Sequence, residues 1–129
     1  MDDEEVPMKY AILIYMNPQS RQIWQELSEG ERSEGLRAYA ALNEELAASG
    51  ELIVTESLAN SDLTRHVTVR GGRPLTGDGP YAEVKEMLAG FYLVDCTSIE
   101  RASEIAARIP EAEGGRLEVR PVMSYSELE

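Results

Sequence analysis

Apolar positions near the start of the chain form first a continuous run and then a helical period. Residues 9–16 read KYAILIYM, which is typical of a strand covered on both faces or near the centre of a sheet. Ser28 and Glu31 form the pattern of a capping box, and apolar residues then recur at helical spacing as far as Gly50. The pattern predicts a strand followed by a helix over about residues 29–49.

The middle of the chain is rich in β-forming residues. Residues 51–58 (ELIVTESL) indicate a second strand, and residues 65–70 alternate between polar and apolar in the manner of a half-buried strand. Gly71-Gly72 fits a two-residue hairpin turn, because paired glycines accept the positive φ angles that such turns require. We therefore expect a hairpin whose second strand, over residues 73–76, is a short edge strand.

The last third of the chain repeats the strand and helix pattern. Residues 91–96 form an apolar strand, Thr97 and Glu100 resemble a second capping box, and the following helical period ends at Pro110. Residues 116–122 alternate again and predict a final strand. This order of elements predicts an α+β domain of the ferredoxin-like type, with a mainly antiparallel sheet and two helices on one face.

Two helices on one face leave the other face of such a sheet without a cover. The apolar side chains of residues 10–16 cannot all point towards the same two helices. A second copy of the chain would cover the open face. We therefore expect a homodimer in which the open faces of two sheets enclose a cavity.

Length and composition fit one domain. The chain has 129 residues, 43% of them hydrophobic, which is enough for one core. We expect an acidic, disordered tail over residues 1–7, a domain over residues 8–125 and a short tail over residues 126–129. No apolar run approaches the roughly 20 residues that cross a bilayer, and the acidic start does not resemble a secretory signal. We expect a cytoplasmic protein without membrane association.

Charge and motifs exclude several further classes. The formal net charge is −12 and the basic residues are scattered, which disfavours direct binding to nucleic acid. Cys96 is the only cysteine, so no internal disulfide can form. The sequence lacks a Cys/His cluster, a Walker-type phosphate loop and a dinucleotide fingerprint, so we expect neither a metal nor a cofactor.

One stretch carries a family resemblance. Residues 78–81 read DGPY, residues 82–86 read AEVKE, and residues 90–95 read GFYLVD. This ordered series resembles the DGPF-domain proteins of the YCII-related group, and the similarity extends from residue 8 to residue 122. The chain departs mildly from the group at Tyr81, where phenylalanine is usual.

The resemblance implies a ferredoxin-like, dimeric α+β barrel, found mostly in bacteria. Some members are implied to be partners of extracytoplasmic-function sigma factors, and others are small enzymes with a His and Asp pair in the cleft. In this chain Tyr39 occupies the approximate position of the group's histidine on the first helix, and the only histidine, His66, lies on an alternating strand. A His and Asp mechanism is therefore not available at matching positions.

Asp78 is the first candidate site residue, with two interpretations. Its carboxylate either caps nearby backbone N–H groups in the turn or projects into a cleft as an acceptor or general base. Lys85 is either a surface ion-pair partner or the cationic group of the site. Further candidates for ligand contacts are Tyr39, Gly79, Pro80, Tyr81 and Glu83.

Two functions of different classes follow. The first is a small-ligand-binding or regulatory dimer that is linked to sigma-factor signalling. The alternative is a small cofactor-free enzyme in which Asp78 is the acid or base and Lys85 stabilises charge on a polar or aromatic metabolite.

Overall fold

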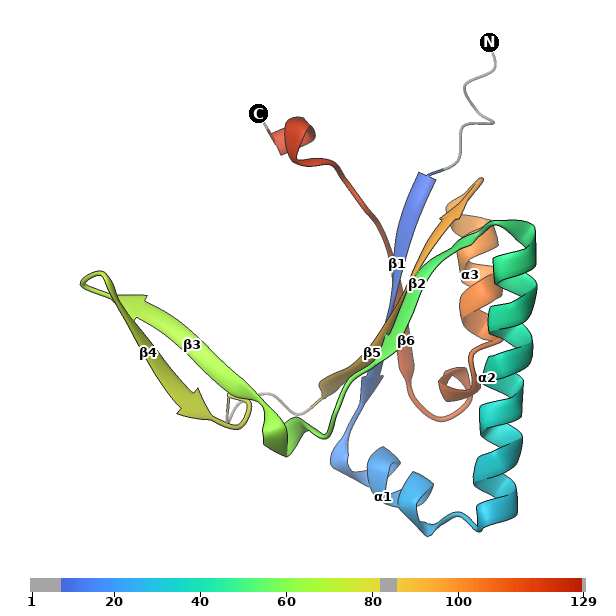
Figure 1. The fold of residues 1–129 in the computed structure, drawn as a ribbon, viewed down its shortest axis with the longest axis horizontal. Coiled ribbons are helices and arrows are strands. Elements are labelled where there is room, and N and C mark those ends of the chain that lie inside the picture. Colours follow the sequence, from blue (N-terminus) through green and yellow to red (C-terminus); the bar gives the residue numbers. More distant parts are fainter. Residues whose placement is uncertain (1–7, 82–85, 129) are drawn as a thin grey trace.

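A four-stranded antiparallel sheet forms the centre of the computed structural model, which describes residues 8–81 and 86–128 (Figure 1). Its strands lie in the order β2-β5-β1-β6. Their bounds are Met8–Met16 for β1, Leu52–Ser57 for β2, Met87–Cys96 for β5 and Arg116–Pro121 for β6. The α+β class and the mainly antiparallel sheet are confirmed, but the described strands form an open sheet and no closed barrel.

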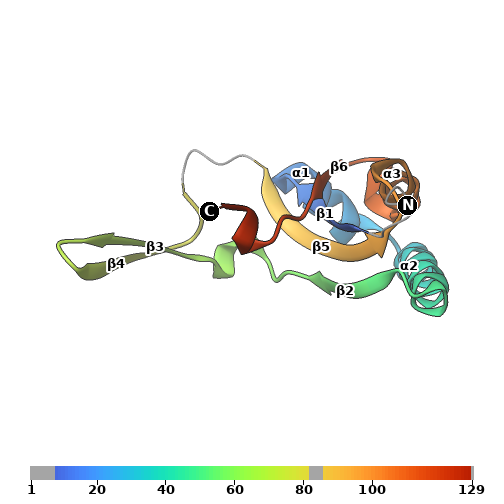
Figure 2. The same cartoon turned by 90° about the horizontal axis from the view of Figure 1, so that it is seen from above.

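Within the described part of the chain, three α-helices accompany the sheet, one more than the sequence predicted. Helices α2 (Glu29–Ser49) and α3 (Ile99–Ala107) cover the same face of the sheet, as Figures 1 and 2 show. The additional helix α1 (Pro18–Glu26) begins directly after β1, where Asn17 accepts a hydrogen bond from the Ser20 N–H and a proline stands in the first turn.

The long helix α2 has the ends that its sequence predicts. Both bonds of the capping box form, since Ser28 accepts from the Glu31 N–H and Glu31 accepts from the Ser28 N–H. Gly50 ends the helix in the left-handed conformation with φ of 84°, which favours glycine. The prediction over residues 29–49 is confirmed.

The core lies between the sheet and the helices. Buried side chains alternate with half-buried ones along β1 and β5, so each strand has one face towards the helices. Strand β1 lies inside the sheet between β5 and β6, so the prediction of a strand near the centre of the sheet is confirmed, while only one face of it is covered by helices within one chain. The buried side chains are those of Tyr10, Ile12, Ile14, Leu42, Leu46, Tyr92, Val94, Cys96, Ala102, Ile105, Ala106 and Ile109.

Strands β3 (Arg65–Arg70) and β4 (Arg73–Asp78) form a separate two-stranded sheet. This β3–β4 hairpin projects away from the helices, on the other side of the main sheet (Figures 1 and 2). Its turn contains Gly71 and Gly72, both with positive φ, as predicted. The predicted hairpin is confirmed, and β4 extends two residues beyond the expected end.

Among the described residues, no helix is both long and apolar enough to cross a membrane. The predicted N-terminal tail over residues 1–7 lies outside the described residues.

Candidate functional site

The DGPY turn (residues 78–81) begins at the last residue of β4 and is hydrogen-bonded to the base of the hairpin. Gly79 has φ of 80°, a conformation that favours glycine, and its N–H donates to the Thr64 carbonyl at 2.6 Å. Gly79 and Pro80 are half-buried, and Tyr81 is exposed. The glycine is therefore required for the shape of the turn.

His66 holds the other side of the DGPY turn. Its Nδ1 lies 2.8 Å from the Gly79 carbonyl oxygen, which indicates an Nδ1–H donor, and its ring lies 4.6 Å from the Tyr81 ring between centroids. Gly77 lies directly against this ring, since an added Cβ would sit 2.3 Å from Nε2. Alternation along residues 65–70 indicated a strand but no contact between His66 and the turn, so this contact was missed. The sequence signal that could have revealed this contact is Gly77, the small residue that pairs with His66 on the opposite strand.

Asp78 itself points into solvent. Its side chain is 94% exposed and lies 3.7 Å from the Arg65 guanidinium across the hairpin. An exposed pair of this kind contributes at most about 1 kcal/mol, because water screens both charges. Within one chain, the carboxylate is therefore surrounded by water and lies outside any enclosed site. The candidates Glu83 and Lys85 lie outside the described residues.

Tyr39 lies on the helical side of the sheet and is not brought together with the DGPY turn. It projects from α2 and donates a hydrogen bond from its hydroxyl to Glu111, which follows α3. Burial raises the pKa of the Glu111 carboxyl above its ordinary value. Tyr39 thus joins α2 to the segment after α3.

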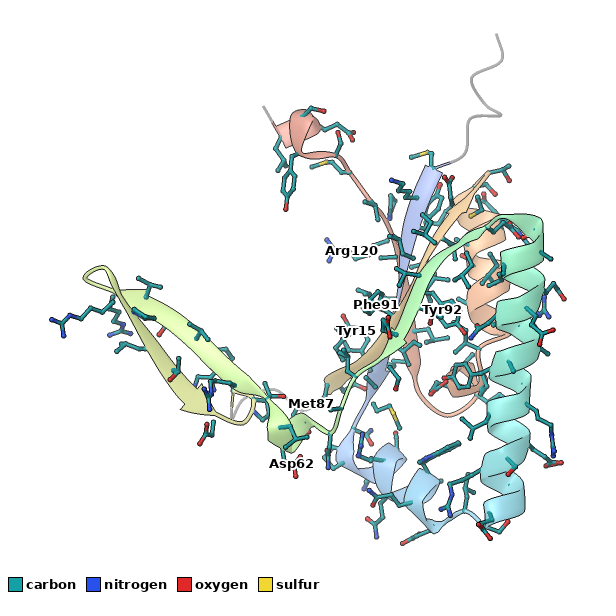
Figure 3. All side chains as sticks on the ribbon, viewed as in Figure 1. Tyr15, Asp62, Met87, Phe91, Tyr92 and Arg120 are labelled. Carbon is teal, nitrogen blue, oxygen red and sulfur yellow. The ribbon has the colours of Figure 1, made fainter. Side chains whose placement is uncertain are left out.

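The open face of the sheet carries a second group of polar side chains. Figure 3 shows Tyr15, Phe91 and Arg120 on the side away from α2, and Tyr92 on the helical side. Burial raises the pKa of the Tyr15 hydroxyl, and the charge of the neighbouring Glu118 raises it further. Sequence reasoning did not identify Tyr15 or Glu118 as site residues, although alternation along residues 116–122 places Glu118 and Arg120 on one face.

Apolar side chains surround this polar group. Leu13 pairs with Phe91 across β1 and β5, and Ala11 pairs with Leu93. Cross-strand partners share one face of a sheet. The residues on either side of Ala11 along β1 are buried under the helices, so Ala11 itself is on the open face. These four side chains are half-buried and form the centre of the open face.

A cleft of about 420 Å³ lies at one end of the sheet. Arg21 of α1 contributes a guanidinium whose Nε is buried without a hydrogen-bond partner among the described residues. Amide and hydroxyl groups around this cation would suit a small anion. The residues that line the cleft are Met16, Asn17, Pro18, Arg21, Gln22, Gln25, Ala59, Asn60, Ser61, Met87, Leu88 and Ala89.

The described residues include no group of three or more His, Cys, Asp or Glu side chains placed to hold a metal ion. Candidate chemistry therefore comes from three places: the exposed DGPY turn, the open face with its tyrosine and arginine, and the cleft at Arg21.

The antiparallel sheet with helices on one face defines an α+β protein. Comparison with known families is more specific: the YCII-related domain matches residues 8–126, and the chain belongs to this family. The chain is also similar to an uncharacterised protein of Rhizobium meliloti (strain 1021), with 32% identity over 120 residues. The aligned region covers 92% of this chain and 94% of that relative, so the similarity extends over nearly the full length of both.

Proposed function

We propose that this protein is a small-ligand-binding homodimer in which the open faces of two sheets enclose the binding cavity. The observation that carries the proposal is the open face itself. It combines a half-buried apolar centre with Tyr15, Glu118 and Arg120, and no described element of the same chain covers it.

The apolar centre supports dimerisation. An antiparallel sheet can have one solvated face when that face is polar, whereas contiguous exposed apolar surface is typical of interaction sites. Leu13, Phe91 and Leu93 would each lose their remaining contact with water against a second copy. Removal of this apolar area from water would stabilise the dimer by roughly 25 cal/mol per Å² before the cost of association.

The polar groups suggest the class of ligand. Arg120 would bind a carboxylate or phosphate, the Tyr15 hydroxyl would donate or accept a hydrogen bond, and Phe91 would stack on an apolar or aromatic body. We therefore propose an aromatic or apolar metabolite with one anionic group. Glu118 would disfavour ligands that carry a second anionic group nearby.

The finer description of the fold belongs to the same proposal. The strands lie in the order β2-β5-β1-β6. Along the chain, α2 lies between β1 and β2, and α3 lies between β5 and β6. This arrangement supports a ferredoxin-like core into which the β3–β4 hairpin is inserted. Two such cores would form a dimeric α+β barrel of the DGPF type.

Association with a sigma factor rests on the family resemblance alone and remains a proposal. Such a partner would place the protein in the cytoplasm. Affinity purification of the tagged protein from its source cells would be expected to recover a sigma factor, and recovery of none would contradict the association.

The test of the proposed function compares two leucine substitutions. Leu93→Glu places a charge at the centre of the open face and should convert a dimer to a monomer, while Leu36→Glu, on the exposed side of α2, should leave the dimer intact. A metabolite panel screened by thermal shift should contain an anionic aromatic compound that stabilises the parent and the Leu36→Glu control. Arg120→Ala should abolish that stabilisation. Unchanged dimerisation of Leu93→Glu would contradict the proposal.

A further inference from the structure

The cleft at Arg21 lies within one chain, so it needs no second copy to enclose a ligand. One wall is helix α1, and the other is residues 59–61, which connect β2 to the β3–β4 hairpin. Both walls lie at the end of the sheet where β1 ends and β5 begins with Met87 (Figures 1 and 3). The volume of about 420 Å³ is within the range of small-molecule sites.

The charge of the cleft lining is positive. Among the described residues that line the cleft, Arg21 is the only charged one, in a chain with 24 acidic residues and a net charge of −12. Glu86, which precedes Met87, is paired with Arg116 at 2.9 Å. Asp62 is exposed and lies outside the lining. The cleft is therefore a local positive site on an acidic protein, which favours an anionic ligand.

The guanidinium of Arg21 is the group that would hold this anion. Its Nε is buried and has no hydrogen-bond partner among the described residues. A buried cationic group without a partner is destabilising, because it has lost its contact with water. Since Nε is shielded, the two terminal NH2 groups form the edge that an anion would contact. Two oxygens of a carboxylate or phosphate match that edge.

Neighbouring side chains offer further hydrogen-bond donors. Asn60 precedes the short helix η2 (Ser61–Leu63), but its side chain makes no capping hydrogen bond there. Asn17 caps α1 through its Oδ1, which leaves its NH2 group as a donor. Both asparagines line the cleft, as does the hydroxyl-bearing Ser61. These amide and hydroxyl groups complement Arg21, because they donate to the oxygens of an anion.

Apolar side chains make up another part of the lining. Met16 and Met87 pair across the ends of β1 and β5, and Pro18 and Leu88 also line the cleft. Methionine side chains adapt to the shape of an apolar group. A ligand that fits both kinds of lining has a carboxylate or phosphate at one end and an apolar body at the other.

We propose that this cleft binds a small organic anion whose carboxylate or phosphate pairs with Arg21. The site is separate from the proposed dimer cavity, because Arg120 pairs with Ala11, about 17 Å along β1 from Met16 at the cleft. The cleft is complete within one chain, so the inference goes beyond the proposed function and does not rest on it. Leu93→Glu should therefore remove the dimer cavity and keep the cleft.

An NMR titration of the isotope-labelled Leu93→Glu variant tests the cleft without the dimer cavity. The probes are benzoate and phenyl phosphate, which present a carboxylate and a phosphate on the same apolar ring. At least one should shift the Nε–H signal of Arg21 and the side-chain amide signals of Asn60, and the tighter of the two identifies the anion. Benzamide, the neutral analogue of benzoate, should bind at least tenfold more weakly than the preferred probe. The same shifts should occur in the unmodified protein.

Arg21→Gln should weaken binding of the preferred probe at least tenfold, because it removes the charge and keeps a polar side chain. Arg37→Gln, at an exposed position on α2, changes the net charge equally and should leave binding unchanged. The proposal would be overturned by the absence of shifts with both probes up to tens of millimolar, by equal binding of benzamide, or by unchanged binding in Arg21→Gln. None of these outcomes bears on the proposed dimer. An unmodified protein that is monomeric and still binds the probe at Arg21 would support the cleft site and overturn only the proposed function.

Discussion

His66 and Gly77 determine the local shape of the hairpin base. The ring of His66 occupies the space that a side chain at position 77 would need, and its Nδ1 bonds to the Gly79 carbonyl. The DGPY turn therefore depends on a contact between residues eleven to thirteen positions apart in the sequence. A contact of this kind leaves no periodic pattern in the sequence. The sequence therefore predicted the turn but not its contact with His66.

Gly77→Ala should loosen the turn. The added methyl group would displace the His66 ring and break its bond to Gly79, at a cost of about 1–3 kcal/mol. Hydrogen exchange of the Gly79 N–H, which bonds to the Thr64 carbonyl, should become at least about tenfold faster. Gly30→Ala is the control, since its Cβ would lie 3.9 Å from the nearest atom. Unchanged exchange in Gly77→Ala would contradict the role of His66.

Glu51 and Arg101 join the start of β2 to α3 and should make stability depend on pH. The guanidinium donates two hydrogen bonds of 2.8 Å to the carboxylate, and the side chains are only 17% and 32% exposed. These bonds lower the pKa of Glu51 below its ordinary value of 4.5. A lowered folded-state pKa gives stability that is present above the ordinary value and is lost as the pH falls through the lowered one.

Glu51→Gln should therefore reduce the free energy of unfolding by about 2 kcal/mol at pH 7. The difference from the parent should shrink as the pH falls below 4.5. Urea unfolding at a series of pH values measures both effects. Glu104→Gln, which removes an exposed partner of the same arginine, should change stability little. A constant difference between Glu51→Gln and the parent at all pH values would contradict the assignment.

At the scale of elements, the β3–β4 hairpin is separate from the main sheet. Its strands pair with each other alone among the described strands. Replacement of residues 65–78 by a short Gly-Ser linker should therefore leave the four-stranded sheet folded, with an unchanged helical signal in far-UV circular dichroism. Loss of cooperative unfolding would show that the core depends on the hairpin.

Most elements could be predicted from the sequence because their signals are local. The capping box at Ser28, the stop at Gly50 and the paired glycines of the hairpin each determine a boundary through neighbouring residues. Helix α1 was missed because its nine residues contain few apolar positions and no buried side chain, so the helical period was weak. The separation of the hairpin from the sheet was missed because pairing partners are not encoded in local pattern.

The candidate site was predicted less completely than the fold. The DGPY sequence identified the turn through Asp78, Gly79 and Pro80, and the prediction that Asp78 belongs to a functional site is still a proposal. Tyr15 and Arg120 were not considered together, since they are over one hundred residues apart and share a face only through the pairing of β1 with β6. Tyr39 was placed with the turn by resemblance, whereas α2 holds it on the helical side.

At the scale of the whole molecule, helices α2 and α3 cover one face of the sheet, and the β3–β4 hairpin and the segment after β6 project on its other side (Figure 2). Leu13 and Leu93 on the open face are only half-buried within one chain. A second copy of the chain on this face would cover them. Dimerisation is therefore the central claim, and the proposed ligand binding depends on it.

Sedimentation equilibrium of the unmodified protein at micromolar concentration tests this claim most directly. The account predicts a single species with twice the chain mass of 14.3 kDa, and a monomer for Leu93→Glu under the same conditions. A single species of 14.3 kDa for the unmodified protein would contradict it.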